Sequence, residues 1–108
     1  MLDQLKNIFK KKKNKGVCKT LDIPVGTSKI VLWNKEEIAI FNVDNQFYAI
    51  SNICAHKGGP LGEGECKGAV VSCPWHIWKY DVTTGKCIMN DKSVKKYEIK
   101  IIDGEIFV

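Results

Sequence analysis

From Val17 onward the chain alternates between short runs of β-branched or aromatic residues and short runs of turn-forming residues. Many short apolar runs at even spacing, bounded by glycine, proline, asparagine or aspartate, are typical of a β-sandwich or β-barrel. The pattern therefore predicts an all-β fold. The expected strands lie near residues 17–23, 29–33, 37–43, 46–50, 69–72, 77–82, 86–89, 97–102 and 105–108.

Two of the turns between these runs predict hairpins. Asp44 and Asn45 separate two predicted strands, and Asp103 and Gly104 separate the last two. Asparagine, aspartate and glycine tolerate the left-handed backbone that a two-residue hairpin turn needs. We therefore expect an antiparallel pair of strands on either side of each turn.

Two segments depart from the strand pattern. Residues 54–64 are rich in glycine and contain Pro60, and residues 73–76 contain Pro74. This composition is typical of loops, so both segments are expected to project from the β scaffold. The two predicted loops hold both histidines of the chain.

The first fifteen residues form a separate segment. Apolar residues recur in it at helix-like spacing, namely Leu2, Leu5, Ile8 and Phe9. A run of lysines follows, so residues 1–15 are interpreted as a basic tail or short amphipathic helix before a domain over residues 16–108. A solvated tail and docking on a membrane surface or partner both fit this pattern. Nucleic-acid binding is not expected, because no aromatic residues are interleaved with the lysines.

Length, charge and cysteine content restrict the class of protein. A chain of 108 residues has the size of one domain. The formal net charge is +5, but it comes mainly from the lysines of the first nineteen residues, so the predicted domain is close to neutral. No run is apolar enough for a secretion signal or a membrane span. The odd number of cysteines, five, argues against a disulfide framework and favours reduced thiols in the cytoplasm.

The histidines and two of the cysteines form a candidate metal site. Cys54-Ala55-His56 and Cys73-Pro74-Trp75-His76 are separated by sixteen residues, and no other histidine occurs. Thiolate and imidazole ligands suit either tetrahedral zinc or an iron–sulfur centre. Zinc fingers usually place both cysteines in one half-site, whereas here each half-site is mixed. A [2Fe–2S] cluster accounts for the mixture if both cysteines bind one iron and both histidines bind the other.

The residues around this site resemble those of Rieske ferredoxins, over about residues 17–108. The matching segments are residues 54–64, residues 73–81 and the pair Thr84-Gly85. The resemblance implies three antiparallel sheets, with a small subdomain whose two loops hold one [2Fe–2S] cluster. The implied ligands are Cys54, His56, Cys73 and His76.

The same resemblance assigns neighbours to these ligands. Gly58 and Trp75 are expected beside them, and the Tyr80 hydroxyl is expected to bond to a ligand sulfur, with a purely core aromatic as the alternative for Tyr80. The remaining cysteines match no ligand of the family and are interpreted as small apolar strand residues. They are Cys18, Cys66 and Cys87.

Several departures from the respiratory branch of the family are informative. That branch has a disulfide between positions that are Gly59 and Trp75 here, and a serine at the position of Trp78. Fewer donors to the sulfurs leave a reduced cluster less stabilised, which favours the low-potential branch. Ile77 stands where glycine is common, and residues 90–93 lack the proline of the family's third loop.

These features predict a monomeric one-electron carrier that passes electrons from a reductase to an oxygenase or related redox enzyme. No catalytic group is expected outside the cluster. The small Rieske subunit of a nitrite-reductase-like complex, a membrane-peripheral redox component that uses the basic tail, and a structural zinc module are the alternatives.

Overall fold

The computed structural model describes residues 15–108, which form ten short strands and two 3-10 helices. The strands make three antiparallel sheets, as predicted: β1-β10-β9 (the outer sheet), β2-β3-β4-β8 (the central sheet) and β5-β6-β7 (the small sheet). No helix in residues 15–108 is long and apolar enough to cross a membrane. The strand bounds are β1 Cys18–Lys19, β2 Ser28–Trp33, β3 Glu36–Val43, β4 Gln46–Ser51, β5 Cys66–Lys67, β6 Val70–Ser72, β7 Lys79–Asp81, β8 Lys96–Tyr97, β9 Lys100–Ile102 and β10 Glu105–Phe107; the helices are η1 Thr20–Asp22 and η2 Leu61–Glu63.

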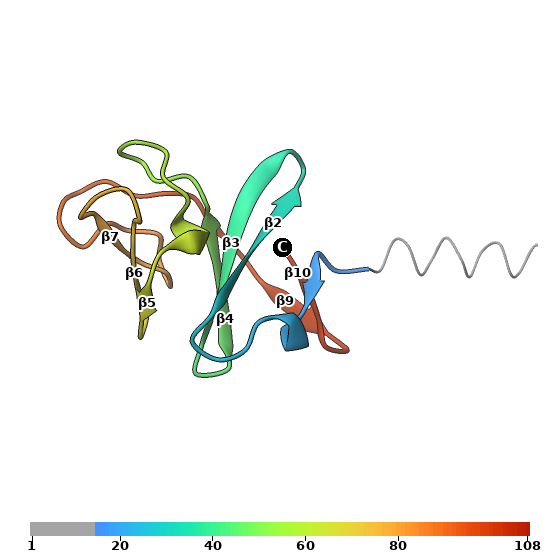
Figure 1. The fold of residues 1–108 in the computed structure, drawn as a ribbon. Coiled ribbons are helices and arrows are strands. Elements are labelled where there is room, and N and C mark those ends of the chain that lie inside the picture. The colour runs from blue at the N-terminus through green and yellow to red at the C-terminus, as the bar shows by residue number, and fades with distance from the viewer. Residues whose placement is uncertain (1–14) are drawn as a thin grey trace, which may run out of the picture.

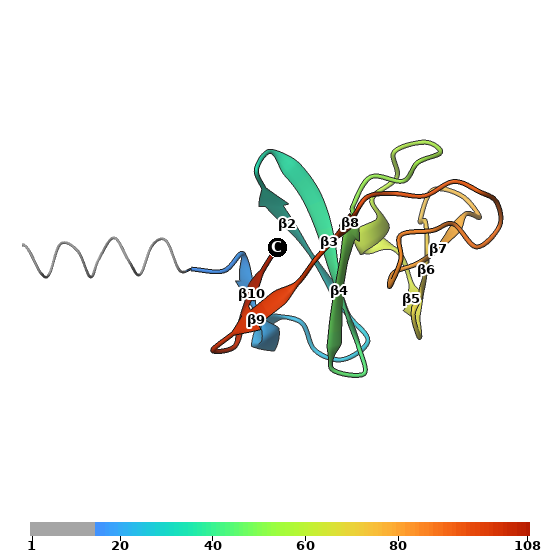
Figure 2. The ribbon, with the colours of Figure 1, turned by 180° about the vertical axis from the view of Figure 1, so that it is seen from behind.

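The three sheets follow one another along the molecule. Figures 1 and 2 show the small sheet at one end, the outer sheet at the other, and the central sheet between them. The C-terminus lies beside the outer sheet, where the described chain also begins. The two loops predicted to bind metal lie at the small-sheet end, away from both of these chain ends.

Strand β3 is buried on both faces. Successive side chains of a strand point to opposite faces, so Ala39 and Phe41 pack toward the small sheet while Ile38 and Ile40 pack toward the outer sheet. None of the four has measurable solvent exposure. Fully burying a large apolar side chain contributes roughly 1.5–3 kcal/mol. The two-sided burial explains why this strand is a continuous apolar run instead of an alternating one.

Both predicted hairpin turns are confirmed. Asp44 and Asn45 have φ values of 52° and 69° and join β3 to β4, whose residues pair in register from Val43 with Gln46. Asp103 and Gly104 have φ values of 52° and 78° and join β9 to β10. In both turns the two central residues are left-handed, the conformation that matches the twist of paired strands.

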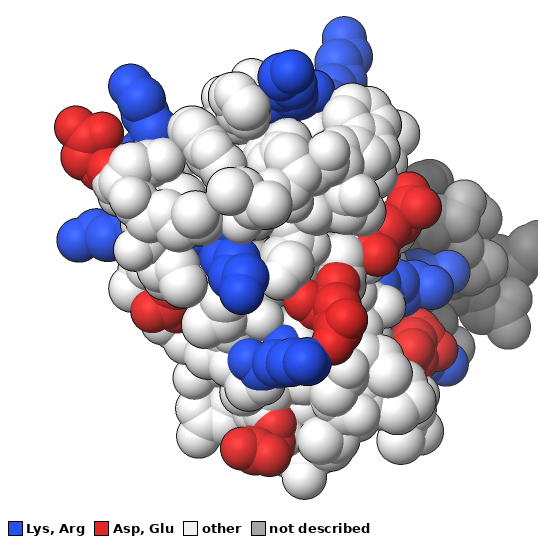
Figure 3. Space-filling model, turned by 60° about the vertical axis from the view of Figure 1, so that its left-hand side comes forward, with Lys and Arg blue, Asp and Glu red and all other residues white. Residues whose placement is uncertain are grey.

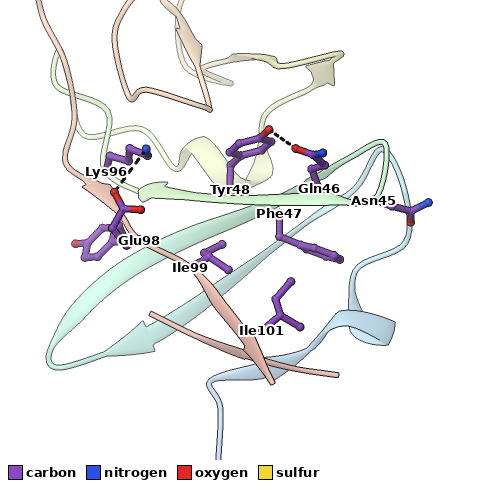
Figure 4. Close-up of a pocket in the computed structure, with 9 residues that line it drawn as sticks. Asn45, Gln46, Phe47, Tyr48, Lys96, Glu98, Ile99 and Ile101 are labelled. Carbon is purple, nitrogen blue, oxygen red and sulfur yellow. Dashed lines mark hydrogen bonds and ion pairs between the residues drawn. The ribbon is translucent and has the colours of Figure 1, made fainter. Parts of the chain in front are cut away.

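The single strand predicted over residues 97–102 is wrong, because the segment divides between two sheets. Tyr97 pairs with β4 in the central sheet, whereas Ile101 pairs with β10 in the outer sheet. The chain crosses between the sheets at Ile99. This crossing opens a groove of about 420 Å³ beside β4, and Figure 4 shows Phe47, Ile99 and Ile101 on the same side of β4 within it.

Two other predicted strands are shorter or absent. Residues 86–89 form only isolated bridges, because the Cys87 N–H donates to Lys92 and the segment turns back on itself instead of extending. Of residues 17–23 only β1 is a strand, since the Asp22 carboxylate accepts from the Lys19 N–H and starts η1. Strand β5, a two-residue edge, was not predicted.

The basic segment over residues 1–15 lies outside the described residues except for Lys15. Gly16, the second described residue, is hydrogen-bonded to the outer sheet, because its N–H donates to Glu105 Oε1 of β10 at 3.0 Å. The division into residues 1–15 and 16–108 stays a prediction.

A hydrogen-bonded group links β8 to β3 across the central sheet. The Tyr97 hydroxyl donates to Glu36 Oε1, and Lys95 Nζ donates to both oxygens of the same carboxylate at 3.2 and 3.4 Å. The bond from Tyr97, followed by that from Lys95, lowers the pKa of Glu36. Burial, followed by the bond to Glu36, raises the pKa of Tyr97 to about 12. The fold therefore favours ionised Glu36 and neutral Tyr97.

We expect Tyr97→Phe to destabilise the protein by about 0.5–1.5 kcal/mol at neutral pH, because one hydrogen bond is lost. The stabilisation of the folded state by neutral Tyr97 is fully present below the ordinary pKa of tyrosine, 10.0. It is lost as pH rises toward the folded-state pKa of about 12. The contribution of ionised Glu36 is present above its ordinary pKa of 4.5 and is lost as pH falls below that value. The thermal midpoints of Tyr97→Phe and of the unchanged protein, measured by circular dichroism, should therefore differ most at pH values between the pKa of Glu36 and that of Tyr97. A constant difference from pH 8 to pH 12 would contradict the assignment.

Candidate metal centre

The first loop begins at a buried asparagine that fixes its base. Asn52 is 1% exposed; its N–H donates to the Glu37 carbonyl at 2.9 Å, and its own carbonyl accepts from Leu61 at 2.8 Å. Its side-chain oxygen accepts from the Gly62 N–H at 2.6 Å. A buried amide with all these partners satisfied holds the two ends of the loop at the edge of the central sheet.

The first loop then closes on itself. The Cys54 N–H donates to the Gly59 carbonyl at 2.9 Å, and the Gly58 N–H donates to the Cys54 carbonyl at 3.0 Å. Gly58 has a φ of +74°, a backbone conformation that glycine adopts without strain. This turn buries Cys54 and leaves His56 exposed at its tip. The structure therefore places Gly58 in the turn that follows Cys54, and its role beside a bound cluster stays a prediction.

The second loop is the tip of the β6–β7 hairpin. Ser72 and Lys79 are the last paired residues of the two strands. Above them the Cys73 N–H donates to the Trp78 carbonyl at 2.9 Å, and the Trp78 N–H donates to His76 Nδ1 at 3.3 Å. The short hairpin thereby buries Cys73 and turns His76 outward.

Three of the four predicted ligands come together. One ligand atom each from Cys54, Cys73 and His76 lie within 4.8 Å of one another. Cys54 Sγ is 3.3 Å from His76 Nε2. The two cysteines are 2% and 4% exposed, so the sulfurs form the floor of the site. Two thiols and an imidazole in this space are a donor set that suits zinc or an iron–sulfur centre.

His56 lies outside that group of three but beside it. Its ring centre is 4.7 Å from that of His76, and the two ring planes are 74° apart. Two imidazoles that share one metal ion at bond lengths near 2.1 Å have ring centres roughly 4.5–5.2 Å apart. The histidine pair therefore has the spacing that binding to a common metal ion requires.

Tyr80 joins the core to the site. Its side chain is fully buried, and its hydroxyl oxygen lies 3.2 Å from Cys54 Sγ and accepts from the Ala55 N–H at 3.1 Å. Because the Ala55 N–H already points at a lone pair of the hydroxyl oxygen, the hydroxyl proton is free to point at the sulfur. The ring belongs to the core and the hydroxyl also reaches the cysteine, so Tyr80 is not a purely core aromatic.

The protonation of the site follows from these contacts. Burial alone would raise the pKa of Cys54, but hydrogen bonds from Tyr80 and from the backbone N–H groups of His56 and Lys57 outweigh it, so that pKa is lowered. Burial, together with the adjacent Cys54 sulfur, raises the pKa of Cys73. Desolvation, followed by His56 and Lys57, lowers the pKa of His76 and keeps it in the neutral form that binds metals.

Gly59 and Trp75 pack on each other between the loops. A Cβ atom at Gly59 would lie 2.6 Å from Cys73 Sγ and 3.2 Å from the nearest indole atoms of Trp75. Trp75 thus lies beside Gly59 with 64% of the residue exposed, and its role next to a bound cluster stays a prediction. Only glycine lets the first loop approach Cys73 this closely.

From the sequence, Trp78 is only the residue that replaces a serine of the respiratory branch, and no contact of its side chain with a ligand is predicted. Its indole stacks on the His56 ring, with ring centres 4.5 Å apart and planes at 11°. Trp78 lies two residues after His76, at the end of the same loop, and this position could have indicated that its side chain contacts the ligands.

The other cysteines contribute none of the clustered ligand atoms, although Cys87 pairs with Tyr80 and shares a buried core with the two candidate ligand cysteines. Cys18 and Cys87 are buried and Cys66 is half-buried, and none of the five cysteines is in a disulfide. Burial raises the pKa of Cys18 and of Cys66, which keeps both thiols protonated and unreactive.

The end of residues 90–93, the segment that lacks the family's proline, lies beside the first loop. Ser93 and Val94 line a cavity of about 540 Å³ that also contacts Ile53, Cys54 and Ala55. Ser93 therefore borders the first loop although residues 90–93 contain no proline.

Comparisons with known proteins agree with this site. Residues 13–100 match the Rieske [2Fe-2S] domain family. The ferredoxin component of the naphthalene 1,2-dioxygenase/salicylate 5-hydroxylase systems of Ralstonia sp. is 38% identical over 82 residues, which cover 74% of this chain and 79% of that protein.

Solved structures give the same result. The Sphingomonas yanoikuyae B1 ferredoxin superimposes with a TM-score of 0.81 at 27% identity, covering 88% of this chain and 97% of that one. A chain from the complex of reduced oxygenase and oxidized ferredoxin in carbazole 1,9a-dioxygenase matches with a TM-score of 0.79 at 29% identity, covering 85% of this chain and 97% of that one.

Gly59→Ala should weaken metal retention, because the new Cβ would lie 2.6 Å from Cys73 Sγ. Overpacking of this kind costs about 1–3 kcal/mol, or roughly 5- to 150-fold in affinity. Gly68→Ala is the control, since a Cβ there meets nothing within 4 Å. Iron bound per chain after reconstitution, measured in a chelator titration, should fall for Gly59→Ala well below the control. Equal retention would mean that the loop moves aside freely.

Proposed function

This chain belongs to the Rieske [2Fe–2S] family, and we propose that it passes single electrons from a reductase to the terminal component of an oxygenase system. Membership of the family means that the protein holds one [2Fe–2S] cluster, so the zinc alternative is wrong. The protein is an electron carrier and not the catalytic component, like the relatives that are named ferredoxin components. The observation that carries the proposal is the convergence of buried cysteines and outward histidines at the tip of the small sheet.

The four predicted ligands divide naturally between two iron ions. We assign the thiolates of Cys54 and Cys73 to one iron and the imidazoles of His56 and His76 to the other. The burial supports this assignment, since the cysteines form the floor while His76 is half-buried and His56 is exposed. When bound, such a cluster accepts and returns one electron at a time.

The surface around the histidines suits docking of a redox partner. Trp75 and Ile77 flank His76 in the sequence and are 64% and 73% exposed. Lys57 and Lys79 are the only charged residues in segments 54–60 and 73–79, and both are exposed. Figure 3 shows a broad uncharged region on the face turned toward the small-sheet end, with charged side chains around its margin. A partner with an apolar contact surface and acidic residues at its edge would fit.

The hydrogen-bond donors near the ligand sulfurs support a low reduction potential for the cluster. Trp78 supplies no hydroxyl where the respiratory branch has a serine, and the Gly59–Trp75 contact replaces its disulfide. The side-chain hydroxyl that reaches a ligand sulfur is that of Tyr80. Fewer hydrogen bonds to the sulfurs give a lower potential.

Other parts of the proposal concern the setting of the protein. Thiols without disulfides support a reducing compartment such as the cytoplasm. We take the carrier to be a monomer, and docking of residues 1–15 on a partner or membrane surface stays a prediction. Copurification with a large catalytic subunit would favour the nitrite-reductase-like alternative instead.

Purified protein should be reddish-brown and contain about two irons and two sulfides per chain. His56→Ala and Cys73→Ala should each abolish the cluster, because each removes a proposed ligand. Cys66→Ala, which removes a cysteine outside the site, is the control. Iron and sulfide analysis, with the EPR spectrum of the reduced protein, checks the result. Stoichiometric zinc without iron in anaerobically prepared protein would overturn the proposal.

Tyr80→Phe should lower the reduction potential. The lost hydrogen bond, about 0.5–1.5 kcal/mol, matters most when the sulfurs carry more negative charge. At about 59 mV per tenfold change in equilibrium, the potential should fall by roughly 20–65 mV. Protein-film voltammetry at fixed pH measures this, with Tyr48→Phe as control because that hydroxyl bonds to Gln46. An unchanged or higher potential would mean that the Tyr80 hydroxyl does not act on the sulfur.

A further inference from the structure

The stacking of Trp78 on His56 connects the two loops of the site. Trp78 ends the second loop and His56 belongs to the first. Their rings are nearly parallel, at 11°, with centres 4.5 Å apart. Offset-stacked aromatic pairs prefer centre distances of about 4.5–7 Å, so this is a close and favourable contact.

The same indole also borders the second histidine. The His76 ring centre lies 5.9 Å from that of Trp78, with the planes at 81°, so His76 meets the indole edge-on. His56 and His76 are themselves 4.7 Å apart. The three rings contact one another pairwise, and the indole is the member that is not a proposed ligand.

His56 needs such a contact more than His76 does. The His76 ring is half-buried, and its Nε2 lies 3.3 Å from the buried Cys54 Sγ. His56 is exposed, and within residues 15–108 its ring has no hydrogen-bond partner. An exposed side chain without a hydrogen bond keeps its rotamer freedom, which must be lost when it binds a metal ion.

We propose that Trp78 is a positioning residue that holds the His56 ring beside His76, in the orientation from which both can bind one iron. The inference rests on the proposed ligand set. The indole limits His56 to rotamers that lie flat against it, so part of the ordering is complete before the metal binds.

The backbone of Trp78 makes hydrogen bonds of its own, and these remain when the side chain is replaced. Its carbonyl accepts from the Cys73 N–H at 2.9 Å, and its N–H donates to His76. These bonds order the second loop, whereas the indole contacts one histidine from each loop. A side-chain variant therefore leaves the backbone bonds in place and tests the contacts of the indole with His56 and His76.

The experiment compares full-length, cluster-loaded Trp78→Leu and Trp78→Phe with the unchanged protein. Leucine removes the stacking surface, and phenylalanine restores a smaller one. Trp33→Leu, which removes a partly exposed indole from β2, is the matched control. Cluster release is followed by loss of visible absorbance in excess chelator at fixed pH, and the reduced EPR spectrum is recorded for each variant.

We expect Trp78→Leu to release the cluster about 2- to 12-fold faster, the range that corresponds to one aromatic pair. Trp78→Phe should recover most of the difference, and Trp33→Leu should match the unchanged protein. The EPR signal of Trp78→Leu should broaden, because His56 samples several orientations. A merely structural role would lower the thermal midpoint without broadening the signal.

Two failures are distinguishable. If Trp78→Leu keeps the release rate and EPR signal of the unchanged protein, the positioning role is wrong while the proposed function stands. If the unchanged protein itself contains no iron, the proposed function fails before any variant is compared.

Discussion

The site depends on one packing contact, that between the small sheet and one face of the central sheet. The first loop leaves the end of β4, whereas the second belongs to the β6–β7 hairpin. Phe41 and Ile50 from the central sheet form a common core with Val71 and Tyr80 from the small sheet. Because all four are fully buried, the hairpin cannot shift without exposing apolar surface. This core holds the strands from which the two loops extend, and so it fixes where the loops and their cysteines begin.

The position of the first loop also depends on close approach of its backbone to neighbouring segments. A Cβ atom at Gly62 would lie 2.4 Å from Ile30 Cγ1, and one at Gly64 would overlap the Ser72 carbonyl. The glycines at the end of the first loop therefore let it lie directly against β2 and against the start of the second loop. Asn52 satisfies the polar backbone groups that this approach buries. Residues 54–64 therefore need glycine for two reasons: the backbone must turn at some positions, and at others it must pack closely against neighbouring segments.

The sequence predicted the features whose causes are local. The spacing of cysteine and histidine, and the turns at Asp44 and Gly104, depend on residues within a few positions of one another. The division of residues 97–102 was not predictable, because it is decided by which distant strand each half meets. The bond from Tyr97 to Glu36 and the stack of Trp78 on His56 were missed for the same reason. Each joins segments whose proximity exists only in the folded chain.

The outward position of the histidines creates a conflict that the second loop resolves. Electron transfer requires the imidazoles to lie near the partner, so they cannot be buried as the cysteines are. An exposed ligand, however, has few neighbours to fix its orientation. Cys54 obtains its orientation from burial and from Tyr80. His56, in contrast, stacks on the indole of Trp78 and otherwise meets the edge-on ring of His76. A large aromatic side chain can hold an exposed ring because it offers a wide contact face on one side and leaves the other side open. Trp78 thus allows the histidine to be both ordered and accessible, which a hydrogen bond from a more enclosed residue would not.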